Sequence, residues 1–77
     1  MPLTADQTEI LMMLLSGASV KTALRSRNLM AEVFADTLNE VLYDLIGDTA
    51  VECDGEELTL VEDYREDIVR MLGGNTE

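Results

Sequence analysis

Histidine is absent from the sequence, and cysteine and basic residues are scarce. The 77 residues include no His, one Cys and five Lys or Arg. Without histidine the chain lacks the usual general base near neutral pH, any Ser-His-Asp or Cys-His arrangement, and most zinc and iron sites. The one thiol, Cys53, lies between Glu52 and Asp54, whose negative charge disfavours a reactive thiolate. The sequence therefore predicts a protein that is not an enzyme.

Long apolar runs and glycine-rich loops are also missing. The longest apolar stretch, 10–15, is far too short to span a bilayer, and the first residues lack the charged start and apolar run of a signal peptide. The glycines fit no phosphate-binding loop. A single cysteine forms no intramolecular disulfide and fits a reducing compartment. We therefore expect a cytoplasmic protein that has no membrane partner.

The charge that is present is mostly negative and unevenly distributed. Asp and Glu number 16, and the net charge is −11. Residues 1–30 carry a net charge of +1, whereas residues 31–77 carry 14 acids against Arg65 and Arg70. A field of this sign repels phosphate backbones and attracts cations and basic protein surfaces. The acids also have a plain interpretation, since they keep a small domain soluble.

Local signals predict helices in the first half of the chain. Thr4 and Gln7 form a capping-box pattern at the start of the first helix, and Gly17 ends it. Ser19 is expected to cap a short second helix, and Asn28 to end that helix in the left-handed conformation. A third helix extends to Gly47. Its 3.6-residue spacing predicts one wide buried face, made of Met30, Val33, Phe34, Thr37, Leu38, Val41, Leu42, Leu45 and Ile46.

A hairpin and a last helix follow. Asp54-Gly55 is the strongest short hairpin-turn signal. Taken as the two-residue loop, it pairs Cys53 with Glu56, Glu52 with Glu57, and Val51 with Leu58. Two like charges then oppose each other across the strands, which is unfavourable and marks a candidate functional position. The apolar positions of the last helix are Val61, Tyr64, Ile68, Met71 and Leu72.

The expected fold class is α+β, mostly α: three helices, a β-hairpin and a C-terminal helix, in a winged-helix-like order. We expect one small domain over residues 1–77, with a core at about 4–72. The element order invites a DNA-binding hypothesis. However, the expected recognition helix presents Glu32, Asp36, Glu40 and Asp44, which have the wrong sign for phosphate contacts. No nucleic-acid partner is expected.

Three functional hypotheses remain from the residues alone. The leading one is a protein-interaction module that meets a basic protein surface, through Glu40, Asp44, Glu52 and Glu57 or through Lys21, Arg25 and Arg27. The alternative is a regulatory domain that binds Ca²⁺ or Mg²⁺, since hard cations prefer carboxylate oxygens. Its candidate ligands are Asp48, Glu52, Asp54, Glu56 and Glu57, although their spacing is not that of an EF-hand. The third is an acidic DNA mimic. No cofactor is otherwise expected.

A segment of the chain resembles a known family. It runs from Leu29-Met30 through Leu38-Asn39-Glu40-Val41-Leu42-Tyr43-Asp44-Leu45-Ile46-Gly47-Asp48 to Glu52-Cys53-Asp54-Gly55. Its Leu-Met helix entry, Asn-Glu pair, closing Gly-Asp and acidic hairpin are similar to the C-terminal domain of TerB-containing, tellurite-resistance-associated bacterial proteins. The likeness covers roughly residues 5–72, and its motifs are short.

The resemblance implies a module of a longer cytoplasmic bacterial protein with tellurite-resistance, stress or phage-defence functions. It also implies that the module is joined to other TerB-type domains, which would be partners within the same parent chain. It also implies a metal-linked role for acids at Glu40, Asp44, Asp48, Glu52 and Asp54. This chain is short and stands without the neighbouring domains expected of the family, so the resemblance alone assigns neither role to it. Asn39 and Glu40 also have a structural interpretation, as polar positions that border the buried stripe.

Overall fold

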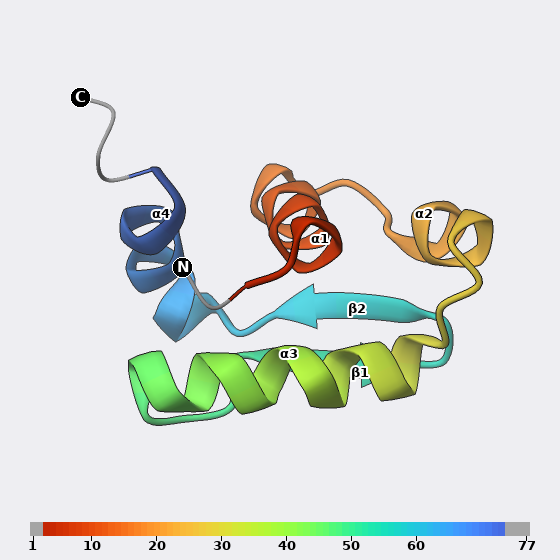
Figure 1. The fold of residues 1–77 in the computed structure, drawn as a ribbon. Helices are drawn as coiled ribbons and strands as arrows, with labels where there is room; N and C mark the ends of the chain where they lie inside the picture. Colours follow the sequence, from red (N-terminus) through yellow and green to blue (C-terminus); the bar gives the residue numbers. More distant parts are fainter. Residues whose placement is uncertain (1–2, 74–77) are drawn as a thin grey trace.

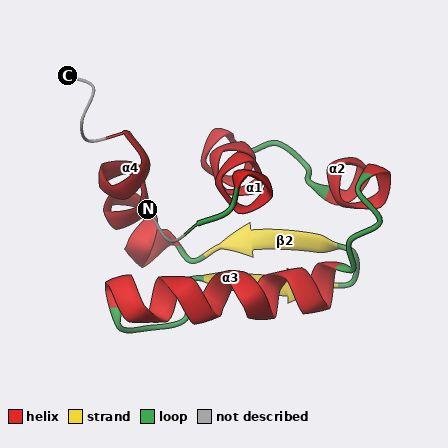
Figure 2. Ribbon diagram, in the orientation of Figure 1, coloured by secondary structure: helices red, strands yellow, loops and turns green. Residues whose placement is uncertain are grey.

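The computed structural model describes residues 3–73, in which four α-helices surround a two-stranded hairpin. The elements are α1 (Ala5–Ser16), α2 (Lys21–Ser26), α3 (Ala31–Ile46), β1 (Val51–Asp54), β2 (Glu57–Leu60), the 3-10 turn η1 (Glu62–Tyr64) and α4 (Arg65–Gly73). The hairpin lies between α3 on one side and α1 and α2 on the other, with α2 and α4 at opposite ends of the molecule (Figure 1). Figure 2 shows how far helix predominates over strand. The predicted fold class and element order are confirmed.

The helix ends form largely as the local sequence predicts. Thr4 and Gln7 make both hydrogen bonds of the capping box. Gly17 and Gly47 end α1 and α3 in the left-handed conformation, and Asn28 has a φ of +58°. The start of the second helix differs from the prediction. Its N-cap residue is Val20 rather than Ser19, and the side chain of Val20 makes no capping hydrogen bond.

A single hydrophobic core joins the helices to the hairpin. Helix α3 packs along β1, and α1 packs against β2 and α4. The residues with the least exposure come from every helix and both strands, among them Ile10, Leu24, Leu38, Leu42, Val51 and Ile68. Burying apolar surface of this kind contributes about 25 cal/mol per Å², so the core fixes how α3 and the hairpin lie relative to each other.

The predicted buried face of α3 is too wide. Phe34, Leu38 and Leu42 are buried, together with Ala31 and Ala35. In contrast, Met30, Val33 and Leu45 expose 69%, 55% and 46% of their surface, and Thr37 is also exposed. A helix packed on a narrow hairpin buries only one stripe, and apolar residues beyond that stripe remain in solvent.

The predicted hairpin turn is misplaced by one residue, and the predicted strand pairs are therefore wrong. The loop is Gly55-Glu56, and the strand pairs are Val51 with Leu60, Glu52 with Thr59, Cys53 with Leu58, and Asp54 with Glu57. Gly55 has a φ of +67° and Glu56 does not have a positive φ, as in a type II′ turn. Glu52 and Glu57 therefore do not face each other.

Candidate functional site

The turn of the hairpin is tied to α2 by an ion pair. Arg25 donates from Nε to Glu56 Oε1 at 2.7 Å and from Nη2 to Oε2 at 3.0 Å. This two-point geometry is the strongest form of a carboxylate–guanidinium contact. The hydrogen bonds from Arg25 lower the pKa of the Glu56 carboxyl below its ordinary value and raise the pKa of Arg25. The sequence predicts both as site residues, and the structure pairs them with each other.

Glu57, the first residue of β2, caps the start of α2. Its carboxylate accepts a hydrogen bond from the Ser19 hydroxyl and one from the Val20 backbone N at 3.3 Å. The first amides of a helix have no partner within the helix, and a negative group there is favourable. The cap expected from Ser19 is thus supplied by a residue 37 positions away from Val20.

Asp48 is also used within the protein. Its carboxylate accepts from the Thr49 backbone N at 2.7 Å and from the Tyr64 hydroxyl. The hydrogen bond from Tyr64, followed by that from Thr49, lowers the pKa of Asp48. The same bond raises the pKa of Tyr64. The contact joins the loop after α3 to η1.

The predicted cation ligands therefore do not gather around one point. Asp48, Glu56 and Glu57 bind protein groups, while Glu52 and Asp54 are exposed on β1. Within residues 3–73, no group of three or more His, Cys, Asp or Glu side chains is placed to hold a metal ion. Cation binding at the hairpin stays a hypothesis from the sequence, and the arrangement of these carboxylates argues against it.

The predicted basic edge is largely neutralised as well. Arg27 binds Asp6 at 3.1 Å, Glu9, and the Ala23 carbonyl at 3.1 Å, and only 26% of its side chain is exposed. The hydrogen bonds to Glu9 and Asp6 raise its pKa. Arg27 thus fixes α2 to α1. Of the three predicted basic residues, Lys21 alone forms no ion pair with a described side chain.

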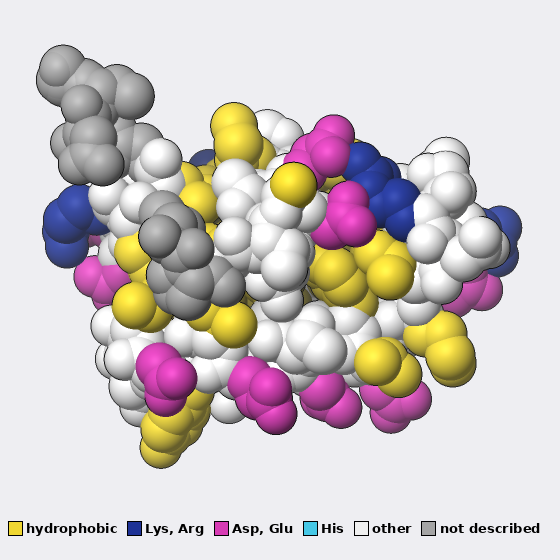
Figure 3. All heavy atoms as spheres, in the orientation of Figure 1, with side chains coloured by type: hydrophobic (Ala, Val, Ile, Leu, Met, Phe, Trp, Pro, Cys, Tyr) yellow, Lys and Arg dark blue, Asp and Glu magenta, His cyan; other side chains and the backbone are white. Residues whose placement is uncertain are grey.

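The outer face of α3 carries four acids that form no ion pair with a described residue. Glu32, Asp36, Glu40 and Asp44 are exposed and follow one another at four-residue spacing, which keeps them on one side of the helix. We call these four residues the acidic stripe. Figure 3 shows the row of acidic side chains along the lower edge of the molecule, where α3 lies.

Only half of the acidic stripe belongs to the site predicted from the sequence. That site includes Glu40 and Asp44, whereas the sequence pattern predicts Glu32 and Asp36 only as outward-facing residues of the helix. The regular spacing from Glu32 to Asp44 is the sequence signal that groups them. Val33 and Tyr43 are exposed, and helical periodicity places both on the same side of α3 as these acids. Apolar surface therefore interrupts the stripe.

Asn39 holds α3 against the hairpin. Its amide donates from Nδ2 to the Val51 carbonyl at 2.8 Å, and Oδ1 accepts from the backbone N of Val51 at 3.0 Å and of Ala50 at 3.2 Å. The side chain thereby satisfies the edge of β1 that faces away from β2, as a further strand would. Asn39 thus does more than border the core, as predicted from the sequence. Its hydrogen bonds to β1 and to Ala50 fix the orientation of the stripe relative to the hairpin.

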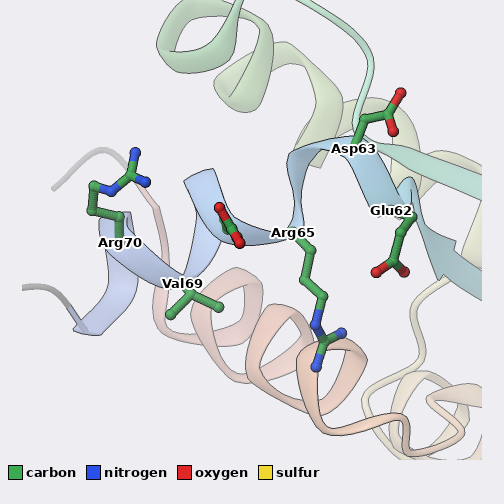
Figure 4. A pocket seen from close by; sticks show the side chains of 6 residues that line it. Glu62, Asp63, Arg65, Val69 and Arg70 are labelled. Carbon is green, nitrogen blue, oxygen red and sulfur yellow. The ribbon is translucent and has the colours of Figure 1, made fainter.

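A shallow depression lies over η1 and α4. Figure 4 shows its side chains, with Arg65 extending toward α1. Arg65 donates to the Leu15 carbonyl, and Arg70 binds Asp67 at 3.4 Å. Glu62, Glu66 and Val69 are exposed at its rim. The two cations of this surface are thus engaged locally, and neither forms an ion pair with the acidic stripe.

No helix of the described residues is both long and apolar enough to cross a membrane. Comparison with known proteins then places the chain in a family. No curated protein and no solved structure matches it. The model of the TerB-C domain matches residues 1–69, which is most of the chain and includes α1, α2, α3 and the hairpin. The chain therefore belongs to the TerB-C domain family.

Proposed function

We propose that this domain is a non-catalytic protein-interaction module whose contact surface is the acidic stripe of α3. The stripe carries four negative charges on one exposed helix face. Its partner is a basic protein surface, on another protein or on another domain of the parent chain. Membership of the TerB-C family supports a role within a larger, tellurite-resistance-associated bacterial protein.

The observation that carries the proposal is the distribution of the arginines. All four are bound elsewhere: Arg25 to Glu56, Arg27 to Asp6 and Glu9, Arg65 to the Leu15 carbonyl, and Arg70 to Asp67. Like charges four residues apart on a helix destabilise it by a few tenths of a kcal/mol per pair. The stripe keeps three such neighbouring pairs, a local arrangement that an oppositely charged partner relieves.

A pair of variants with equal net charge tests the proposal. In one, the stripe is neutralised by Glu32→Gln, Asp36→Asn, Glu40→Gln and Asp44→Asn. In the other, four exposed acids elsewhere are neutralised by Glu52→Gln, Asp54→Asn, Glu62→Gln and Glu66→Gln. Each changes the net charge from −11 to −7, so long-range attraction is reduced equally.

The probe is a helical lysine-rich peptide, and binding is measured by calorimetry at ~0.15 M salt, where screening limits long-range attraction to about 8 Å. We expect the stripe variant to lose binding and the control variant to keep most of it. An equal loss in both variants would show that the peptide senses only net charge, and the proposal would be withdrawn.

A further inference from the structure

An apolar groove adjoins the N-terminal end of the acidic stripe. It is formed where the start of α1, the segment 28–30 and the first half of α3 meet, and it has a volume of about 460 Å³. Its walls include Leu29, Met30, Val33, Phe34 and Thr37. Figure 3 shows apolar side chains just above the acidic row toward this end of α3. We call it the α1–α3 groove.

Two apolar residues that line the groove, Met30 and Val33, are unusually exposed. Met30 exposes 69% and Val33 55% of their surface, although large apolar side chains of a small domain are valuable in its core. Met30 is the N-cap residue of α3 and has an extended backbone (φ −86°, ψ 130°). Its side chain makes no capping hydrogen bond. Methionine is flexible and polarisable and adapts to varied apolar partners.

The charges beside the groove determine which partner fits. Glu32 is adjacent in sequence to Val33, and Asp36 follows one turn later, so acidic groups border the apolar walls on α3. Successive acids of the stripe are about 6 Å apart along the helix axis, since each residue rises about 1.5 Å. A second helix with Lys or Arg every four residues has the same repeat.

We infer that the partner is a basic amphipathic helix that lies along α3, with its basic residues against the acidic stripe and one apolar side chain in the α1–α3 groove. This inference rests on the proposed function and specifies its partner. Helix-in-groove recognition places affinity in a few apolar anchors and specificity in the charges around them.

The test uses two helical peptides of about 18 residues, both with lysine at every fourth position. One carries leucine as the anchor at one end, and the other has alanine there. The groove is made polar by Met30→Gln with Val33→Thr, which leaves the charge unchanged. The matched control makes the same two chemical changes, Met12→Gln with Val69→Thr, at exposed apolar residues of the hollow between α1 and α4.

We expect the groove variant to bind the leucine peptide roughly tenfold more weakly, as for loss of one apolar anchor, and the alanine peptide as before. The control variant should bind both peptides like the wild type. Equal binding of the two peptides, together with loss in the stripe variant, would overturn the groove and leave the proposed function intact. If neither peptide depends on the stripe, both the proposed function and this inference fail.

Discussion

The side-chain amide of Asn39 binds both backbone groups of Val51, donating to its carbonyl at 2.8 Å and accepting from its amide at 3.0 Å. It also accepts from the amide of Ala50. One side chain on α3 thus takes the place of a third strand beside β1. This contact sets the position of the acidic stripe relative to the hairpin.

Replacing Asn39 by alanine should strongly destabilise the fold. Three partly buried backbone groups lose their partners, at about 1–3 kcal/mol for an unsatisfied buried group. We expect a loss of roughly 3 kcal/mol in the free energy of unfolding, a large share of what a small domain possesses. Urea denaturation followed by circular dichroism measures it. Glu40→Ala, at the exposed neighbour, removes two repulsive pairs of the stripe and should not lower the stability; equal losses in the two variants would refute the role of Asn39.

The contact between Tyr64 and Asp48 should make stability depend on pH at both extremes. The lowered pKa of Asp48 contributes stability that is present above its ordinary value of 3.8 and is lost as the pH falls through the lower folded value. The raised pKa of Tyr64 contributes stability that is present below its ordinary value of 10.0 and is lost as the pH rises through the higher folded value.

Tyr64→Phe isolates this contribution. The difference in melting temperature between wild type and variant should be constant from about pH 5 to 9 and should shrink below about pH 4 and above about pH 10. Tyr43→Phe is the matched control, because Tyr43 is exposed on α3 and should give no such profile. A Tyr64→Phe difference that stays flat across the whole range would contradict the contact.

Introducing one base into the acidic stripe should stabilise the domain while weakening its binding. Asp36→Lys removes two repulsive pairs and places the new lysine four residues after Glu32, which is the favourable orientation of an ion pair on a helix. At about 0.2–0.5 kcal/mol per pair, the three changes together give a gain of roughly 0.6–1.5 kcal/mol. The gain should fall at ~1 M salt, where screening acts over about 3 Å. Glu52→Lys on β1 changes the net charge equally and serves as the control. If the two variants gain alike, repulsion within the stripe is not the cause.

Calcium should not stabilise the domain through the hairpin. Three of the five candidate ligands already bind protein groups, so a cation that uses one of these three has to compete with Arg25, Ser19 or Tyr64. We expect the same melting temperature in ~1 mM calcium as in chelator. A rise in the wild type that Glu52→Gln with Asp54→Asn abolishes, but Glu62→Gln with Glu66→Gln does not, would instead establish the hairpin site.

Signals contained within a few residues predict the fold well. The Thr4–Gln7 capping box, the ends at Gly17 and Gly47, and the positive φ of Asn28 all depend on neighbouring residues, and all are present. The hairpin is present but its turn is displaced from the predicted position, because both Asp54-Gly55 and Gly55-Glu56 give the glycine a position with positive φ.

The candidate site is predicted less well because its determinants are distant in sequence. Helical periodicity shows which side of α2 is exposed, but not that Arg25 meets a residue 31 positions away. Composition likewise does not separate acids that bind protein groups, such as Glu57, from acids that bind no residue within 3–73, such as Asp36. The exposure of Val33 depends on how narrow a surface the hairpin offers to α3.

The internal use of the arginines has a consequence for how copies of the domain behave together. Two molecules that approach through α3 bring like-charged faces into contact, and like-charge juxtaposition across an interface is strongly unfavourable. Self-association through this helix is therefore discouraged even at high local concentration. The face stays accessible to a positively charged molecule. Two copies of the domain are kept apart at this face by charge repulsion rather than by steric hindrance.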